Sequence, residues 1–92
     1  MGDTELDKLR RAIDAVDTSL LELIHERVRL VLEVGAYKAK RGLAVYDPER
    51  ERRLLERLTS LAQPPVEPDT VRRIFERLID ESRRLEQRHT PR

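Results

Sequence analysis

Apolar residues recur every three or four positions along the first part of the chain, which is the period of an amphipathic α-helix. At about 100° per residue, they form one broad stripe. Its members are Leu6, Leu9, Ile13, Val16, Leu20, Ile24, Val28, Val31 and Val34. The pattern predicts a helix over residues 5–41, before Gly42. Because such a helix is about 50 Å long, we expect a second copy of the chain to cover its stripe in a homodimer.

Two shorter helices are predicted after this one. Asp47, Pro48 and Glu49 are typical of a helix start, and the second helix is predicted over residues 48–61. The prolines between positions 64 and 68 interrupt helical structure and form a linker. A third helix is predicted over residues 69–88, with an apolar stripe made of Val71, Ile74, Phe75, Leu78, Ile79 and Leu85. The expected fold is an all-α, three-helix subunit in a single domain, residues 1–92.

Composition narrows the classes of function. Charged residues make up 40% of the 92 residues and aromatic residues 3%, which favours long helices with much surface. The net charge of +1 gives no general attraction to nucleic acid or to an anionic membrane. The chain has no cysteine, which excludes disulfides and fits a reducing compartment, and no apolar run approaches the length of a membrane span. We therefore expect a cytoplasmic protein without nucleic-acid or membrane partners.

Polar residues occupy several positions on the apolar faces. They are Arg10, Asp17, Arg27 and Lys38 on the first helix, Arg50 and Glu51 on the second, and Ser82 and Glu86 on the third. Because an unpaired buried charge is very costly, the excess of cations predicts a negatively charged ligand. A lattice of ion pairs inside a helical bundle is the other interpretation, and Asp17 is assigned to it as a structural partner for a nearby base.

The spacing separates the three cations of the first helix. Arg27 and Lys38 differ by about 20° in direction and about 16 Å along the axis, so both long side chains can reach one small anion. Arg10 lies about 25 Å further along the helix, out of reach of that anion. If all three bind ligand, Arg10 serves the site of the partner subunit, and each dimer has two shared sites. His25 faces outward and His89 lies in the tail, so neither is expected to be catalytic.

Motifs for other chemistries are missing from the sequence. It contains no metal-ligand spacing, no glycine-rich phosphate loop and no nucleophile beside a base. Chemistry without a cofactor, by positioning and electrostatics, is therefore expected.

Five motifs, in order and with their spacing intact, resemble the all-helical chorismate mutases. They are LRRAIDxVD (9–17), ER (26–27), EVGxxK (33–38), DPERE (47–51) and IDESxxxE (79–86). The resemblance covers residues 6–88. It implies an intertwined homodimer of three-helix subunits, an isomerase that converts chorismate to prephenate on the way to phenylalanine and tyrosine.

The resemblance also implies roles for the matching residues. Arg27 and Arg10 of the partner subunit would bind the two substrate carboxylates, with Ser82 assisting at the Arg27 end. Lys38 would contact the ether oxygen and a carboxylate. Glu86 occupies the place of the second donor to that oxygen, where many members have Gln. Because an ionised carboxylate cannot donate a hydrogen bond, Glu86 must be protonated to act there.

The second helix would hold the ring hydroxyl of the substrate. Glu51 and the backbone of Asp47 take this role by resemblance, and Arg50 would support that wall. This segment argues against an isochorismate pyruvate-lyase, which shares the fold and the cationic cage. The remaining alternative is a non-catalytic dimeric helical module, in which the misplaced charges set the pairing register.

Overall fold

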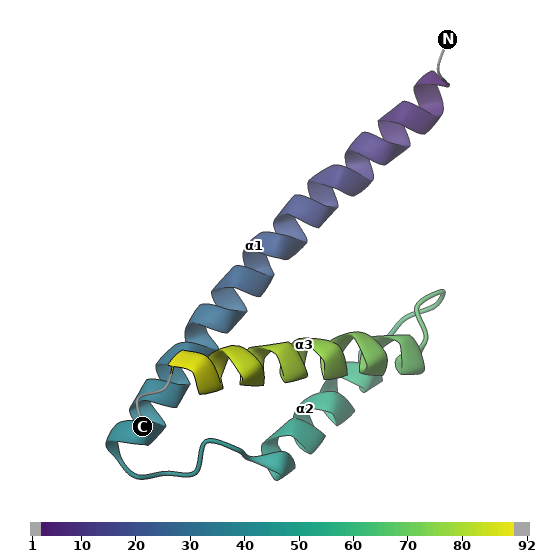
Figure 1. Cartoon of the computed structure of the whole chain (residues 1–92). Coiled ribbons are helices and arrows are strands. Elements are labelled where there is room, and N and C mark those ends of the chain that lie inside the picture. The colour runs from purple at the N-terminus through teal and green to yellow at the C-terminus, as the bar shows by residue number, and fades with distance from the viewer. Residues whose placement is uncertain (1–2, 90–92) are drawn as a thin grey trace. The chain divides into compact units, whose positions relative to one another are not determined.

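The computed structural model describes residues 3–89, and the regular structure among them is all α-helical. The helices are α1 (Thr4–Lys40), α2 (Pro48–Ser60) and α3 (Pro68–His89), as Figure 1 shows. The all-α fold class is confirmed, and each helix begins and ends within one residue of its predicted bounds. The chain divides into two compact units, Met1–Leu30 and Val31–Arg92, so α1 contributes to both. A single domain over residues 1–92 stays a prediction.

The first unit consists of the N-terminal part of α1. Asp3 caps this helix, because its Oδ1 accepts hydrogen bonds from the backbone N–H groups of Glu5 (3.0 Å) and Leu6 (3.2 Å). The apolar stripe along this part is exposed in the single chain, with Ile13 58% and Val16 65% accessible. Exposed apolar patches larger than a few hundred Å² are rare on monomers and mark interaction sites.

α1 ends in a glycine cap. Gly42 has φ +66°, and its N–H donates to the carbonyl of Ala39 at 3.3 Å. The N–H of Leu43 donates to the carbonyl of Lys38 at 2.9 Å. Together these bonds form a Schellman motif, which satisfies carbonyls left open at the end of a helix.

We expect Gly42→Ala to lower the free energy of unfolding by about 1 kcal/mol, because a Cβ is strained at positive φ. No described atom lies within 4 Å of the place a Cβ would take, so the cost comes from the backbone alone. Urea unfolding, monitored by circular dichroism, measures this change in the free energy of unfolding. Gly42→Asn is the control, since Asn tolerates this conformation better and should lose less. An alanine variant as stable as the wild type would contradict the assignment.

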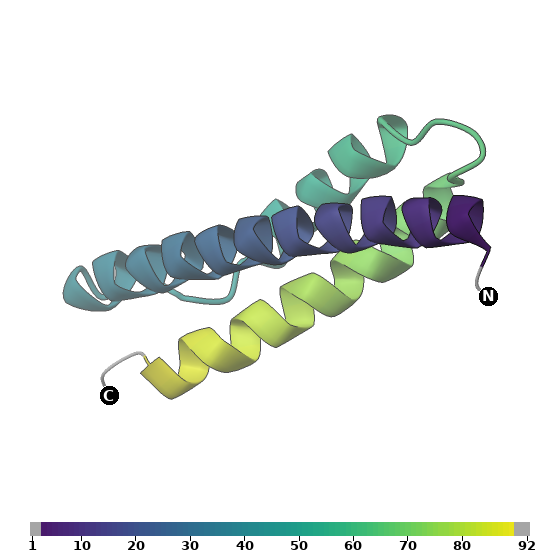
Figure 2. The same ribbon diagram turned by 90° about the horizontal axis from the view of Figure 1, so that it is seen from above.

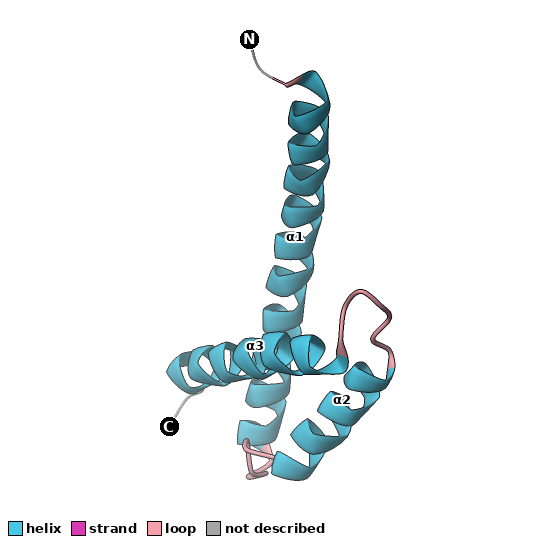
Figure 3. Cartoon of the chain, turned by 90° about the vertical axis from the view of Figure 1, so that its right-hand side faces the viewer, coloured by secondary structure: helices cyan, strands magenta, loops and turns pink. Residues whose placement is uncertain are grey.

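α2 and α3 form a helix pair within the second unit. The two helices pack against each other, and α3 runs back across α2 after the connecting loop (Figures 1 and 2). That loop contains a cis peptide bond between Pro64 and Pro65. Figure 3 shows this loop at one end of α2 and the connection from α1 at the other end. Leu54 of α2 and Ile79 of α3, each 9% exposed, are the buried apolar side chains among the described residues.

Two further buried side chains in the described chain are polar, and both come from α3. Ser82 is 3% exposed and Glu86 is 7% exposed. A hydroxyl and a carboxyl are therefore more deeply buried than most of the apolar side chains in this small unit, which directs attention to the end of α3.

Candidate active site

Glu86 is the buried acid of the second unit. It lies one turn beyond Ser82 on α3, so the two side chains share one face of the helix. Burial raises the pKa of Glu86, whereas the positive charges of Lys38 and Arg83 act in the opposite direction. The net raised pKa increases the fraction of Glu86 that is protonated at a given pH. A protonated carboxyl can donate a hydrogen bond, which a carboxylate cannot do.

Lys38 brings a cation from α1 to the same region. It is half-buried, and its Nζ donates to the carbonyl oxygen of Val45 at 3.4 Å. Because Val45 belongs to the connection after α1, this bond ties the lysine side chain to the segment that leads into α2. The effect of Lys38 on the pKa of Glu86 places its charge within electrostatic reach of that carboxyl. Lys38 and Glu86 therefore belong to the same unit and their charges interact, and their joint action on one oxygen stays a prediction.

Glu51 is the carboxylate that α2 contributes beside this cluster. It is half-buried in the first turn of α2, and its Oε1 pairs with Nη2 of Arg83 from α3. The guanidinium carbon of Arg83 lies 4.5 Å from the centre of the Tyr46 ring, in the arrangement of a cation–π contact. Arg83 therefore connects α3 with α2 and with the segment before it.

Arg83 is not among the site residues predicted from the sequence. It stands next to Arg84 in a charged run, which is typical of a solvent-exposed helix face. One signal could have revealed it: Arg83 precedes Glu86 by three residues, so the two side chains are neighbours on the helix surface.

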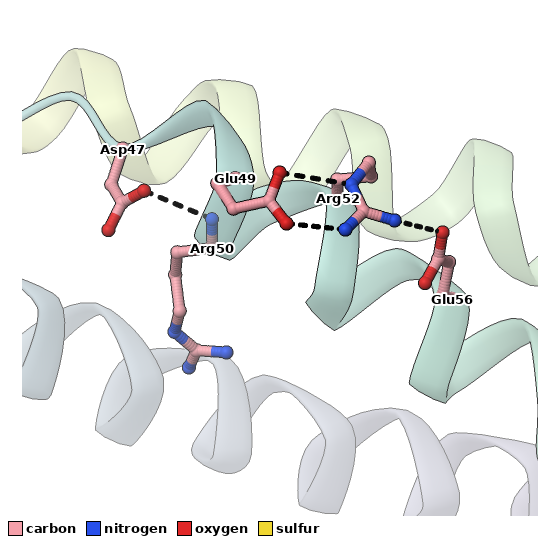
Figure 4. Close-up of polar contacts among 5 residues, drawn as sticks. All are labelled: Asp47, Glu49, Arg50, Arg52 and Glu56. Atoms are coloured by element: carbon pink, nitrogen blue, oxygen red, sulfur yellow. Dashed lines mark hydrogen bonds and ion pairs between the residues drawn. The ribbon is translucent and has the colours of Figure 1, made fainter.

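Asp47 and Arg50 lie at the start of α2. Asp47 is the N-cap, and its Oδ1 accepts the backbone N–H of Arg50 at 3.0 Å (Figure 4). On the exposed face, Arg52 pairs with Glu49 and Glu56, and the hydrogen bond from Arg52 lowers the pKa of Glu49. Such exposed pairs contribute little to stability. The guanidinium of Arg50 extends away from this chain of charges, as Figure 4 shows, so it is not part of that surface network.

The other predicted residues belong to the first unit. Arg10 is exposed in the single chain and Arg27 is half-buried. Their approach to the cluster in the second unit stays a prediction. Asp17 is exposed in the single chain, so its pairing with a base stays a prediction as well. His25 and His89 are exposed, and the expectation that neither is catalytic stays a prediction.

Over residues 3–89, no group of three or more His, Cys, Asp or Glu side chains is arranged to hold a metal ion. In the same range, none of the helices is both long and apolar enough to cross a membrane. The second unit contains a buried acid, Glu86, whose pKa is affected by the charges of Lys38 and Arg83. The carboxylate of Glu51 pairs with Arg83. Fold and cluster define an all-helical protein with a buried carboxyl and two cations gathered in its second unit.

Comparison with known proteins identifies the family. The family model for chorismate mutase type II matches residues 9–87. The chain therefore belongs to the chorismate mutase type II family.

Individual relatives agree with this assignment. The chain is 31% identical over 86 residues to the chorismate mutase of Methanocaldococcus jannaschii, covering 92% of this chain and 87% of that protein. It is 42% identical over 79 residues to the T-protein of Enterobacter agglomerans, covering 85% of this chain but only 21% of that protein. The chain thus spans about a fifth of the T-protein. A structure of chorismate mutase (form II) from Thermus thermophilus superposes with a TM-score of 0.89 at 36% identity, covering 95% of this chain and 99% of that one.

Proposed function

We propose that this protein is a chorismate mutase, an isomerase that rearranges chorismate to prephenate in the biosynthesis of phenylalanine and tyrosine. The observation that carries the proposal is the family match over residues 9–87. The likeness to the T. thermophilus structure over nearly the whole of both chains supports it. The buried Glu86, whose pKa is raised and on which the charge of Lys38 acts, supports the proposal as well, because a protonated carboxyl and a cation are donors that such a reaction can use.

The reaction is a unimolecular, pericyclic rearrangement, so it needs neither a nucleophile nor a general base. The enzyme must fold a flexible dianion into its reactive conformer, and fixed cations achieve this by preorganisation. Arg27 and Arg10 of the partner subunit are the proposed ligands of the two carboxylates, because the planar guanidinium matches a carboxylate. Ser82 assists at the Arg27 end.

In the transition state, the breaking C–O bond places negative charge on the ether oxygen. Lys38 and protonated Glu86 are proposed to donate to this oxygen. Donors fixed in advance bind the transition state better than the ground state, and each contributes about 3–4 kcal/mol by analogy with oxyanion holes. Glu51 and the backbone of Asp47 hold the ring hydroxyl, and Arg50 supports that side of the site.

Incubation with chorismate tests this function directly. Loss of chorismate absorbance together with formation of prephenate supports the mutase, and a parallel incubation with isochorismate separates the alternatives. Release of pyruvate from isochorismate alone would instead indicate an isochorismate pyruvate-lyase. No turnover of either compound by a folded dimer would indicate a non-catalytic helical module.

A homodimer with shared sites is part of the proposal. The exposed stripe of α1 supports it, since Leu9, Ile13 and Val16 are each more than half accessible in the single chain. The described core of one chain is small, with Leu54 and Ile79 as its buried apolar residues. Packing a second copy against the stripe would remove this apolar surface from water at about 25 cal/mol per Å².

We expect sedimentation equilibrium at micromolar concentration to give about twice the chain mass of 10.8 kDa. Val16→Asp places a charge on the stripe and should shift the protein to monomers with reduced helicity. Thr18→Asp, two residues away on the exposed polar face, makes the same change in charge and should leave the dimer intact. A folded, active monomer of the wild type would overturn the dimer and the shared site together.

A further inference from the structure

The guanidinium of Arg83 contacts three other side chains, although Arg83 lies in a run of charged residues typical of an exposed helix face. Its Nη2 pairs with Oε1 of Glu51, and its guanidinium stacks on the ring of Tyr46 at 4.5 Å. Asp80, one turn earlier on α3, lies 3.9 Å from Nη1. Tyr46, Glu51 and Arg83 come from the connection, α2 and α3 respectively, so a single guanidinium joins three segments of the second unit.

The neighbouring Arg84 shows that this arrangement is particular to position 83. The side chain of Arg84 is 60% exposed and pairs with Glu81 on its own helix. The side chains of Arg83 and Glu51 are 33% and 23% exposed, so their pair is partly shielded from water. Charge pairs shielded in this way are stronger and better ordered than surface pairs, whose contribution is usually small.

The geometry of the pair leaves one carboxylate oxygen for a ligand. The described contact uses Oε1 of Glu51, so Oε2 can accept a hydrogen bond. A guanidinium that lies over an aromatic ring and also pairs with a carboxylate has few orientations, and the carboxylate is restricted with it. Without Arg83, Glu51 would sample several rotamers in the first turn of α2.

We propose that Arg83 is a positioning residue, which holds the Glu51 carboxylate in the orientation that accepts the ring hydroxyl of chorismate. This inference rests on the proposed function and deepens it, because it assigns hydroxyl recognition to a Tyr46–Arg83–Glu51 unit. Arg83 acts through Glu51 and does not bind the substrate itself.

A double-mutant cycle with Glu51 tests the inference. Arg83→Met should lower kcat/KM for chorismate about tenfold or more, because misplacing a binding group by about 1 Å can cost up to about 100-fold. In the Glu51→Gln background, the same change should cost less than about twofold, because the group that Arg83 positions has already been altered. Arg83→Lys keeps the positive charge but lacks the planar guanidinium. Its kcat/KM should therefore lie between that of the wild type and that of Arg83→Met.

Two controls separate positioning from other effects. Arg84→Met removes an arginine from the adjacent position and should change kcat/KM less than about twofold in either background. Assays are run on the acidic plateau of the pH profile, because the charge of Arg83 also acts on Glu86. A chorismate analogue without the ring hydroxyl should react equally well with the wild type and with Arg83→Met.

Each outcome of these experiments either supports or overturns the inference. Non-additive losses at Arg83 and Glu51, together with an insensitive analogue, support the inference. Additive losses in folded dimers would show that Arg83 acts independently of Glu51, and would overturn the inference while leaving the proposed function intact. Wild-type protein without activity on chorismate would overturn the proposed function, and the inference with it.

Discussion

Glu86→Ala is expected to lower kcat/KM for chorismate about 100- to 1,000-fold at every pH, which is the usual effect of removing one donor from a preorganised oxyanion site. Glu86→Gln is expected to remain active, because its amide donates a hydrogen bond whatever the pH. Comparison of the two variants separates the need for a donor at this position from the need for a carboxyl.

The pH dependence follows from the ionisation of Glu86. Burial raises its pKa, and the dianionic substrate raises it further, whereas Lys38 and Arg83 oppose the shift. Only the protonated form donates, so the rate constant of the wild type should be constant at low pH. It should fall as the pH rises through the pKa of Glu86 in the complex. Glu86→Gln has no such ionisation and should lose this fall.

Rate profiles of kcat against pH for the wild type and Glu86→Gln measure the effect. Glu81→Gln is a matched control: it makes the same chemical change on α3, at a side chain paired with Arg77 and Arg84. Its profile should follow that of the wild type. Identical profiles for the wild type and Glu86→Gln would show that Glu86 is not the titrating donor.

Arg10→Ala and Arg27→Ala are each expected to lose nearly all activity as pure proteins, and to recover part of it when mixed. Each change would remove a proposed carboxylate ligand from both sites of the proposed homodimer. In a heterodimer, one site takes Arg27 from the first variant and Arg10 from the second, so it is complete. Random pairing at equal concentrations makes half of the dimers mixed, so about a quarter of the wild-type activity should return.

The experiment requires unfolding the two variants together and refolding them, so that subunits exchange. Each variant refolded alone is the control for activity recovered without exchange. A different affinity tag on each chain, purified in sequence, shows that heterodimers have formed. Heterodimers without activity would place Arg10 and Arg27 in the same subunit's site, and would rule out the shared site.

Local features of the structure could be predicted from the sequence. The three helices follow from apolar periodicity, and their ends follow from residues such as Asp47 with Pro48, and Gly42. These features are predictable because backbone hydrogen bonds and caps join residues only a few positions apart. The shared helix face of Ser82 and Glu86 could be predicted in the same way, because residues four positions apart lie on one face of an α-helix.

The arrangement around Glu51 was decided by tertiary structure. Its partner Arg83 is 32 residues away in the chain, and the pair exists because α3 packs against α2. Arg83 and Arg84 are identical in residue type and adjacent in sequence, yet one is half-buried at the site and the other is exposed. Periodicity contains no information on the crossing of two helices or on side-chain rotamers, so it could not distinguish them.

The sequence by itself determined that this protein is all-helical, that cations and carboxyls lie on its apolar faces, and that Lys38 and Glu86 are candidates for one site. Only the tertiary structure showed that Glu86 is buried with a raised pKa, that the charge of Lys38 acts on it, and that Arg83 pairs with Glu51. The physical reason is that desolvation and charge–charge interactions depend on distances between helices. Helix formation, by contrast, depends mainly on neighbours along the chain.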